Sequence, residues 1–516
     1  MRLLVKIWLC AGCLLGIAEW SQARPTEPDT LMRALREAAS PTNALIREAY
    51  ANPATRPDAF GHSLSELSIG YRLQTEEQPT VRQKGDRTDF GYFATEGYRH
   101  LSEKSTLWGD AGYRIGKRRN VVWNLASDYE LIYPAITTDT VGGGDLTSEE
   151  YTFGGGYGHR GERFGWGASA DVRAGQEYRT TDPRPRNITI DISATLGGSL
   201  RIGRYKAGLS ASLRVYKQTS ATYFANPIGG TGLFRLTGLG AYYAGYTGDN
   251  QDTEGDLYRG NGFSAEAVLL PAHGRKGLFL TLGYDRLKIT KILRSYKHLP
   301  LQEVIPHTFR ADAAWLQRPE QGLYWGIGVK NRYEYREGIE NIVAESVGGA
   351  YETIGALKTF EYSLLQNRLE LLVGRESPRS AWAVSPWAAY QRRTADYLYP
   401  AQHMEHAHAG GGVEVHYTYQ GHRTMLRTTV GADYFASLSH NLAIPVANID
   451  IPQLVEMVRY EYDRRSQDRL GLQAALRGDY RLRKRMTLFL AADYRIDRYR
   501  DGTLSHYAQI ACGLAF

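Results

Sequence analysis

The sequence of 516 residues has little sulfur and few long apolar runs. It contains three Cys, six Met and 19 Pro, and its mean hydropathy is −0.42. Beyond the first two dozen residues no run of about 18 apolar residues occurs, which excludes a helical membrane protein. Aromatic residues make up 11% of the chain, too many for a disordered protein. Gly (55) and Tyr (36) are abundant instead. This balance leaves one membrane class open, a closed β-barrel of alternating strands.

The first 23 residues have the pattern of a signal peptide. Arg2 and Lys6 give a cationic start, Ile7–Ala18 is mostly apolar, and Ser21-Gln22-Ala23 offers small residues before a cleavage site. The run is too short to span a bilayer. A lipoprotein signal is the alternative, because Cys10–Cys13 weakly resembles a lipobox. We therefore predict export to the cell envelope of a Gram-negative cell.

Residues 24–63 are the only helix-like part of the mature chain. A first piece starts after Asp29 as a plausible N-cap and is interrupted by Pro41, and a second covers residues 43–50. We predict that Arg24–Phe60 forms a periplasmic tail or a plug in the mouth of a barrel.

Period-2 alternation of apolar and polar residues dominates residues 64–516, the expected barrel domain. In residues 470–482, Leu and Ala share one face while Arg, Gln and Asp share the other. Three features favour an antiparallel transmembrane β-barrel over a soluble sandwich. The strands are about a dozen residues long, short and long connections alternate, and the last strand ends on Phe516, as in the insertion signal of outer-membrane barrels.

The connections predict about eighteen strands, with 14 to 20 possible. Short turns are expected on one rim and long loops on the other, the outer-membrane pattern. The expected short turns are 117–120, 159–163, 201–204, 273–276, 318–321, 374–380, 420–423 and 483–485. The expected long connections include 133–150, 219–258, 336–357 and 436–467. Leu64–Leu73 also alternates but would break the even count, so we expect it in the plug or in an extra periplasmic element.

Charged residues at inward positions of the expected strands are mixed in sign. Such residues would line or brace a polar lumen. They are Asp191, Arg310, Asp312, Arg368, Glu370, Arg427, Asp433, Arg477, Asp493 and Arg495.

One cluster has the residue types of a metal site and is expected on a long extracellular loop. It contains His403, Glu405, His406 and His408, with Met404 between them. Imidazoles at this spacing suit Zn, Cu or Ni, so a transition metal is a possible cofactor. The alternative is a polar loop that is rich in His by chance.

Other candidate motifs predict structure more than chemistry. The run Asp182–Asn187, with two Pro and two Arg, is either a rigid loop or an anion site. The triple-glycine runs lack the Lys and following helix of a phosphate loop. No catalytic constellation stands out, and nothing indicates nucleic-acid binding.

One family resemblance rests on several motifs in combination. These are Leu107-Trp108-Gly109, 120–123, Tyr133-Pro134, 150–157, Trp166-Gly167, Tyr178-Arg179, 182–187 and Tyr216-Lys217-Gln218. Together they resemble an outer-membrane barrel family of unknown function whose genes tend to lie beside those of TonB-dependent receptors. More distantly, a helix ending in Asn52-Pro53-Ala54 is similar to long-chain fatty-acid transporter barrels, whose N-terminal segment plugs the lumen.

We therefore expect an integral outer-membrane protein, not an enzyme, that passes or captures a small solute as a plugged channel or transporter. The alternative is a non-conducting binding or assembly protein, and an outer-membrane hydrolase is the third hypothesis. Expected partners are membrane lipid and the barrel-assembly machinery, which would read the C-terminal strand. A TonB-dependent receptor or a surface lipoprotein is a further expected partner.

Overall fold

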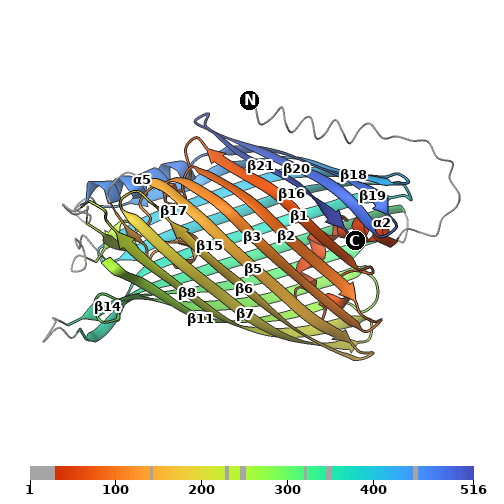
Figure 1. The fold of residues 1–516 in the computed structure, drawn as a ribbon, viewed down its shortest axis with the longest axis horizontal. Coiled ribbons are helices and arrows are strands. Elements are labelled where there is room, and N and C mark those ends of the chain that lie inside the picture. Colours follow the sequence, from red (N-terminus) through yellow and green to blue (C-terminus); the bar gives the residue numbers. More distant parts are fainter. Residues whose placement is uncertain are drawn as a thin grey trace.

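The computed structural model describes residues 30–139, 143–226, 232–243, 252–318, 322–344, 351–445 and 451–516. The predicted signal peptide, its cleavage site and the lipobox alternative lie outside these residues. The described chain forms an 18-stranded antiparallel sheet that closes on itself as a barrel (Figure 1). The predicted fold class, an all-β transmembrane barrel of about eighteen strands, is confirmed.

The strands follow one another around the barrel in chain order, each pairing with the strands before and after it. They are β1 (Leu64–Glu76), β2 (Arg87–His100), β3 (Ser105–Val121), β5 (Gly144–Arg160), β6 (Phe164–Tyr178), β7 (Arg184–Ile202), β8 (Tyr205–Tyr223), β11 (Asp252–Pro271), β12 (Gly277–Leu293), β13 (Leu299–Gln317), β14 (Gly322–Val343), β15 (Thr353–Glu376), β16 (Ser380–Leu398), β17 (Ala401–Gln420), β18 (Thr424–Ala443), β19 (Arg469–Arg483), β20 (Met486–Tyr499) and β21 (Leu504–Ala515).

Short elements lie outside the barrel sheet. A small sheet has the order β10-β9-β4, and helices occur before β1 and in the β1–β2, β3–β5 and β18–β19 connections of the described chain. Their bounds are β4 (Thr137–Thr138), β9 (Phe234–Gly238), β10 (Ala241–Tyr242), α2 (Thr30–Ala38), α3 (Thr42–Ile46), η1 (Arg47–Tyr50), η2 (Arg56–Asp58), η3 (Arg82–Lys84), α4 (Tyr129–Ile132) and α5 (Pro452–Arg465). The expectation that only residues 24–63 are helix-like is therefore wrong. Within the described ranges no helix is both long and apolar enough to cross a bilayer.

Strand β1 closes the barrel. It pairs with β2 on one side, with Leu64 opposite Tyr98, and with β21 on the other, with Tyr71 opposite Ile510. The expectation that Leu64–Leu73 belongs to a plug or an extra periplasmic element is therefore wrong. Without β1, the strands β2 and β21 would both present unpaired backbone groups to lipid, which is costly.

One expected short turn is also misplaced. Residues 117–120 lie within β3, and the turn on the short-turn rim is formed by residues 101–104 between β2 and β3. The count of eighteen still holds because two errors cancel. The strand β1 was left out of the expected barrel, whereas the turn placed at the wrong end of β3 implied one strand too many after it. The other seven short turns lie on one rim, which we call the short-turn rim, where Phe516 also lies. The opposite end is the long-loop rim.

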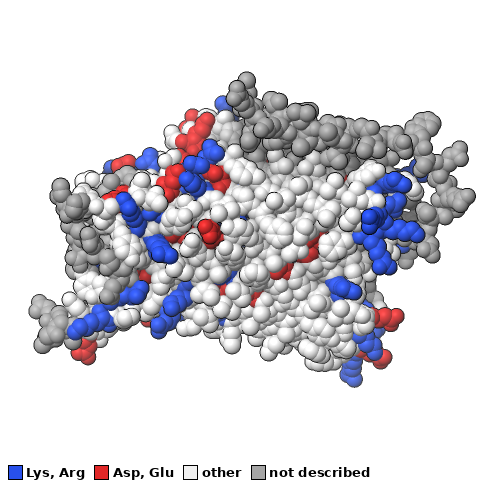
Figure 2. Space-filling view, viewed as in Figure 1, with Lys and Arg blue, Asp and Glu red and all other residues white. Residues whose placement is uncertain are grey.

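The outer wall is apolar between the two rims. Outward residues alternate with inward ones, so that Leu196, Leu209 and Leu213 each expose about 70% of their surface. Figure 2 shows Lys, Arg, Asp and Glu gathered toward the two ends of the face, with a mostly uncharged band between them. Such a surface is stable in hydrocarbon and unfavourable in water.

Exposed aromatic residues border this band on both sides. Trp166, Trp315, Trp325 and Trp382 lie near the short-turn ends of their strands. Near the middle of β11–β14, on the long-loop side of these Trp residues, Phe263, Tyr284, Phe309 and Tyr333 form a continuous row in which Tyr284 is half-buried, with ring centroids 4.9–6.3 Å apart. We call this row the upper aromatic girdle. Two girdles that border an apolar band are typical of membrane barrels.

Candidate functional site

The N-terminal segment, residues 30–63, lies in the barrel mouth at the short-turn rim, near the C-terminus (Figure 1). Side chains hold it to backbone and polar groups of the rim. Arg36 donates to the carbonyl oxygens of Ser377 and Pro378 at 2.6 and 2.9 Å. Arg318 donates to Thr42 Oγ1 at 3.0 Å, and Arg275 donates to Asn43 Oδ1 at 2.7 Å. The segment contributes no strand to the barrel sheet.

Glycines on the inner wall make room for the backbone of residues 52–57. A Cβ atom at Gly167 would lie 2.3 Å from the Pro53 carbonyl oxygen, and one at Gly197 would lie 2.2 Å from Asn52 Oδ1. Gly158 meets Pro57 in the same way. These glycines lie on neighbouring strands, so they form a recess that any larger side chain would fill.

Apolar contacts complete this end of the barrel. Leu45, Ile46 and Tyr50 pack with wall residues such as Phe279 and Leu316 in one buried cluster. Asp58 adds ion pairs with Lys206 and Arg160, the latter at 3.0 Å. The N-terminal segment therefore occupies the mouth with its own small core instead of lying loosely in it.

The other end of the lumen is covered by the long connections. The β3–β5 connection carries α4 and β4, the β8–β11 connection carries β9 and β10, and the β18–β19 connection carries α5. A buried apolar cluster joins them to the wall and includes Trp123, Ile132, Leu236, Phe360 and Leu454. We call these elements the inner cap.

Buried charges tie the inner cap to the wall. Asp128 accepts two hydrogen bonds from Arg173, at 2.9 and 2.8 Å, and one from the Tyr216 hydroxyl at 3.0 Å. Deeper in the cap, Asp256 lies 3.3 Å from both Arg235 and Lys291, and each of these three side chains is at most 3% exposed. Buried pairs are costly to break singly, because the partner would remain as an isolated charge.

Between the N-terminal segment and the inner cap lies a series of hollows. Four of them have volumes of about 380, 470, 580 and 480 Å³. They share lining residues: Arg214 lines the first, second and fourth, and Asp110 and Thr152 line the third and fourth. We therefore describe them as one internal chamber.

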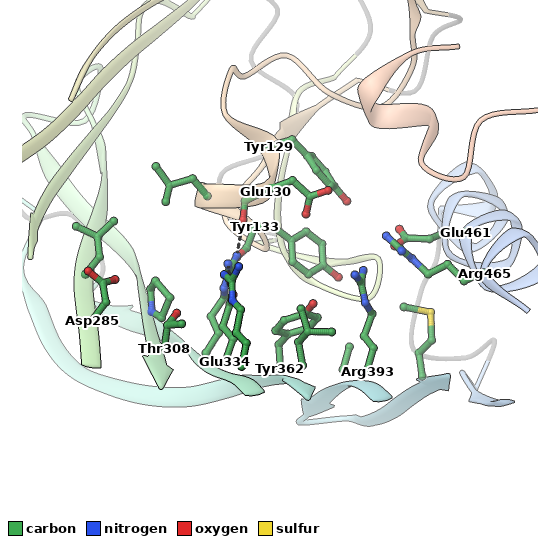
Figure 3. A pocket seen from close by; sticks show the side chains of 18 of the residues that line it. Tyr129, Glu130, Tyr133, Asp285, Thr308, Glu334, Tyr362, Arg393, Glu461 and Arg465 are labelled. Carbon is green, nitrogen blue, oxygen red and sulfur yellow. Dashed lines mark hydrogen bonds and ion pairs between the residues drawn. The ribbon is translucent and has the colours of Figure 1, made fainter. Parts of the chain in front are cut away.

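One hollow of the chamber lies beside α5 (Figure 3). Tyr129, Glu130 and Tyr133 reach it from the inner cap, Glu461 and Arg465 from α5, and the remaining labelled residues from wall strands. Other cations that line the hollow have acidic partners, such as Arg465 with Glu461 at 2.7 Å. Among the described residues, Arg393 has no ion pair, and its guanidinium lies 5.7 Å from the centre of the Tyr362 ring.

Electrostatics keep the cap side of this hollow charged. Burial disfavours the carboxylate of Glu130, but attraction to Lys84, Arg393 and Arg465 outweighs it and holds the pKa of Glu130 below its usual value. Burial opposes the charge of Arg465, but its pairing with Glu461 is stronger and raises the pKa of Arg465. Both groups are therefore ionised at neutral pH.

The structure places the ten sequence-predicted lumen residues on inward positions of their strands. Most of them take part in networks with other charged residues. Asp191 pairs with Arg214 at 2.7 Å, and Arg477 pairs with Glu66 at 2.5 Å and Asp479 at 2.9 Å. The other pairs are Arg310–Glu48, Arg368–Glu370, Arg427–Asp479 and Arg495–Asp433, while Asp312 and Asp493 lie beside Lys330 and Arg72. Whether any of them contacts a solute stays a prediction.

The histidine cluster was expected on a long loop, but it lies within β17. The strand directs His403 and Glu405 outward, where His403 bonds Asp396 at 2.6 Å. His406 and His408 face inward, and His406 Nε2 lies 3.1 Å from the Tyr462 carbonyl oxygen. Alternation therefore divides the four residues between two faces. In the part of the chain that the structure describes, no three His, Cys, Asp or Glu residues converge on a metal-sized site.

Two further predicted features have clear positions. Asp182, in the β6–β7 connection, accepts hydrogen bonds from the N–H groups of Ala225 and Asn226 in the β8–β11 connection, and Arg184 bonds it at 2.7 Å. The Ala225 hydrogen bond is the main reason that the pKa of Asp182 lies below its usual value. These contacts favour a structural role over an anion site, although only Asp182 and Pro183 lie in a loop, because β7 begins at Arg184. Phe516 exchanges backbone hydrogen bonds with Ser65, and its role in insertion stays a prediction.

Sequence reasoning missed the residues that seal the chamber. The anchors Arg36, Arg275 and Arg318 contact residues far away in sequence, so no local pattern marks them. Helix α5 was hidden in a connection expected to be a loop. Pro452 at its first turn was an available signal.

Comparison with known proteins finds distant similarity only. No curated protein matches the chain. Among solved structures, it is similar to BauA, the ferric preacinetobactin receptor of Acinetobacter baumannii, with 9% identity and a TM-score of 0.39 over 88% of this chain and 80% of that one. The ferric yersiniabactin uptake receptor FyuA of Yersinia pestis has 9% identity and a TM-score of 0.36, with 88% and 80% covered. The siderophore receptor PiuA of A. baumannii has 7% identity and a TM-score of 0.38, over 89% of this chain and 82% of that one.

Similarity at this level carries no conclusion about what the chain binds. The sequence model of a family matches residues 53–516, most of the chain. The resemblance in sequence to a barrel family without known activity is thereby confirmed, while the expected gene neighbourhood and the likeness to fatty-acid transporters stay predictions. The chain belongs to the family of unknown function DUF6850.

Proposed function

We propose that this chain is an integral outer-membrane protein that passes or captures a small polar solute, with the N-terminal segment as its gate. The apolar outer wall between two aromatic girdles supports the location. Short turns face the periplasm in barrels of this kind, so the N-terminal segment would close the periplasmic end and the inner cap the extracellular end.

The chamber is the observation that carries the proposal. Barrels of 16–18 strands leave an aqueous channel unless something fills them. Here the N-terminal segment and the inner cap occupy the two ends, and hollows with charged linings remain between them. A chamber that is closed at both ends and polar within suits a solute that is handled in steps.

The chamber favours a solute with an anionic group. Most wall charges are already paired, so they brace the wall and offer little net charge to a ligand. Arg393 is different, because it projects into the hollow beside α5 without an ion pair among the described residues (Figure 3). A guanidinium can bind a carboxylate or a phosphate through two parallel hydrogen bonds.

The contacts of the N-terminal segment allow it to leave. Its anchors are hydrogen bonds from Arg36, Arg275 and Arg318, the ion pairs of Asp58 and a small apolar cluster, and none of them is covalent. Each hydrogen bond from a guanidinium contributes roughly 1.5–3 kcal/mol net. The barrel itself is closed by β1–β21 pairing and does not depend on the segment.

A reversible crosslink tests the gate. A Cβ atom at Gly328 would lie 3.5 Å from Leu45 Cγ, so a Leu45→Cys/Gly328→Cys pair fits a disulfide after the Leu side chain is shortened. Cys512 is exposed, so Cys512→Ser is the background. We expect single-channel conductance to be lower in the oxidised pair than in the reduced one, and to rise when residues 24–60 are deleted.

The single variants Leu45→Cys and Gly328→Cys are the controls, because neither can form the crosslink. Silence of the oxidised, reduced and deleted forms alike would contradict the channel. It would favour the alternative, a non-conducting protein whose loops dock a receptor or a surface lipoprotein.

A further inference from the structure

A group of cations faces outward on β8, β11 and β12, just beyond the upper aromatic girdle. Lys217 and Arg259 are both exposed and lie directly opposite each other in the β8–β11 register. Lys288 is the diagonal neighbour of Arg259, because it pairs with Asn261, and Arg286 pairs with Phe263. We call Lys217, Arg259, Arg286 and Lys288 the outer basic patch.

The patch is electrostatically unusual because its charges are not balanced. Like charges directly opposite each other on neighbouring strands are destabilising. Lys288 pairs with Glu303 at 2.7 Å. Across the described residues, no acidic side chain forms an ion pair with Lys217, Arg259 or Arg286. The protein thus places three uncompensated cations on one outer surface.

Several outward cations on the same rim have acidic partners. Lys358 pairs with Glu361 at 2.5 Å, Arg392 pairs with Glu405 at 3.0 Å, and Arg119 pairs with Asp89 at 2.8 Å. Lys117, Arg186 and Arg498 have no ion pair among the described residues, but none of them lies directly opposite another cation. The repulsion between the unpaired Lys217 and Arg259 is therefore a local feature of β8 and β11. An anion from outside the chain would remove it.

The height of the patch on the barrel indicates which anion. Two residues of the upper aromatic girdle lie close to the patch: on β12 Tyr284 is two residues before Arg286, and on β11 Phe263 is two residues after Asn261. On β8, Val215 lies two residues before Lys217 and is 53% exposed. Aromatic girdles mark the boundary between hydrocarbon and head groups. Cations at this height meet lipid head groups.

We propose that the outer basic patch binds the phosphate groups of a lipid in the outer leaflet of the membrane. The apolar wall below the patch would contact the acyl chains, and Lys217 and Arg259 would bind one phosphate between them. The cations would thereby exchange mutual repulsion for charge-assisted hydrogen bonds. This inference depends on the proposed location of the barrel but not on the gate or on any solute.

Lipid retention tests the proposal. The full chain, purified in detergent, is incubated with diphosphorylated lipid A or with the same lipid after removal of its phosphates, and bound lipid is measured by native mass spectrometry. We expect the wild type to retain the phosphorylated lipid preferentially. Lys217→Gln/Arg259→Gln should weaken retention by about fivefold for each cation removed. Lys217→Arg/Arg259→Lys, which preserves the charges, should retain the lipid.

The matched control is Lys358→Gln/Arg392→Gln, which removes two outward cations from the same rim that have acidic partners. Heat-modifiable migration in SDS gels verifies that every variant is folded. Equal retention of both lipids by the wild type, or equal loss in the control pair, would overturn the proposal. So would displacement of the lipid by the same concentration of inorganic phosphate, which would make the patch a general anion site. Conductance is not measured, so this outcome is separate from that of the gate.

Discussion

At the residue scale, two neighbouring glycines on β7 have opposite surroundings. A Cβ atom at Gly197 would collide with Asn52 Oδ1 of the N-terminal segment, whereas one at Gly198 would only touch the Phe164 ring at 3.8 Å on the outer face. The same residue type thus serves docking at one position and is replaceable at the next. Alternation of strand faces produces this difference, since successive side chains point to opposite sides.

We expect Gly197→Val to displace the N-terminal segment while the barrel stays folded. Overpacking at such a contact typically costs about 1–3 kcal/mol, which is comparable to one of the anchoring hydrogen bonds. Limited proteolysis should then cleave residues 30–63 faster in the variant than in the wild type. Gly198→Val is the control and should leave the cleavage rate unchanged. Equal rates in both variants would show that the recess does not hold the segment.

At the element scale, α5 is held to the rim by its last turn. Arg464 is 4% exposed and donates to Asp501 at 2.5 Å and to Thr503 at 3.1 Å in the β20–β21 connection. Its guanidinium also lies 4.7 Å from the centre of the Tyr499 ring. Apolar residues of the same helix, such as Leu454, belong to the cluster of the inner cap. The helix therefore joins the cap to the barrel wall.

We expect Arg464→Met to loosen α5 without unfolding the barrel. The change removes hydrogen bonds of a charged group, each worth roughly 1.5–3 kcal/mol. Hydrogen exchange of residues 452–465 should become faster, while exchange in β19 and β20 stays as slow as in the wild type. Arg459→Met is the matched control, because Arg459 is exposed on the same helix. The same acceleration in the control variant would contradict the role of Arg464.

At the scale of the whole molecule, the barrel and its gate are separable. Residues 30–63, the described part of the chain before β1, contribute no strand to the barrel, whereas β1 is bonded on both edges, to β2 and to β21. A barrel that lacks β1 would leave two strand edges open to lipid. The boundary between what closes the barrel and what closes its lumen therefore lies close to residue 64.

Two truncations test this boundary. Deletion of residues 24–60 should leave a folded barrel that migrates anomalously in SDS gels until it is heated. Deletion of residues 24–76 should abolish that heat-modifiable band, because the sheet cannot close. A heat-modifiable band of equal intensity in both truncations would show that β1 is dispensable.

Much of the architecture could be predicted from local patterns in the sequence. Alternation in Leu470–Leu482 has a period of two, which any strand with one face in lipid must have, and it revealed inward residues such as Arg477. The loop lengths and the terminal Phe516 predicted the class of barrel. Each of these signals needs only a few neighbouring residues to be recognised.

Tertiary structure decided everything that depends on distant partners. Leu64–Glu76 is a barrel strand because β2 and β21 lie beside it, and residues 117–120 extend β3 because β2 and β5 continue to pair with it. The histidines were recognised as a group, but strand pairing separated His403 from His406. The chamber depends on loops that fold inward and on Arg393 facing them. The alternation in the sequence determines whether a side chain points into the barrel or outward, and only closure of the barrel determines which residues it contacts.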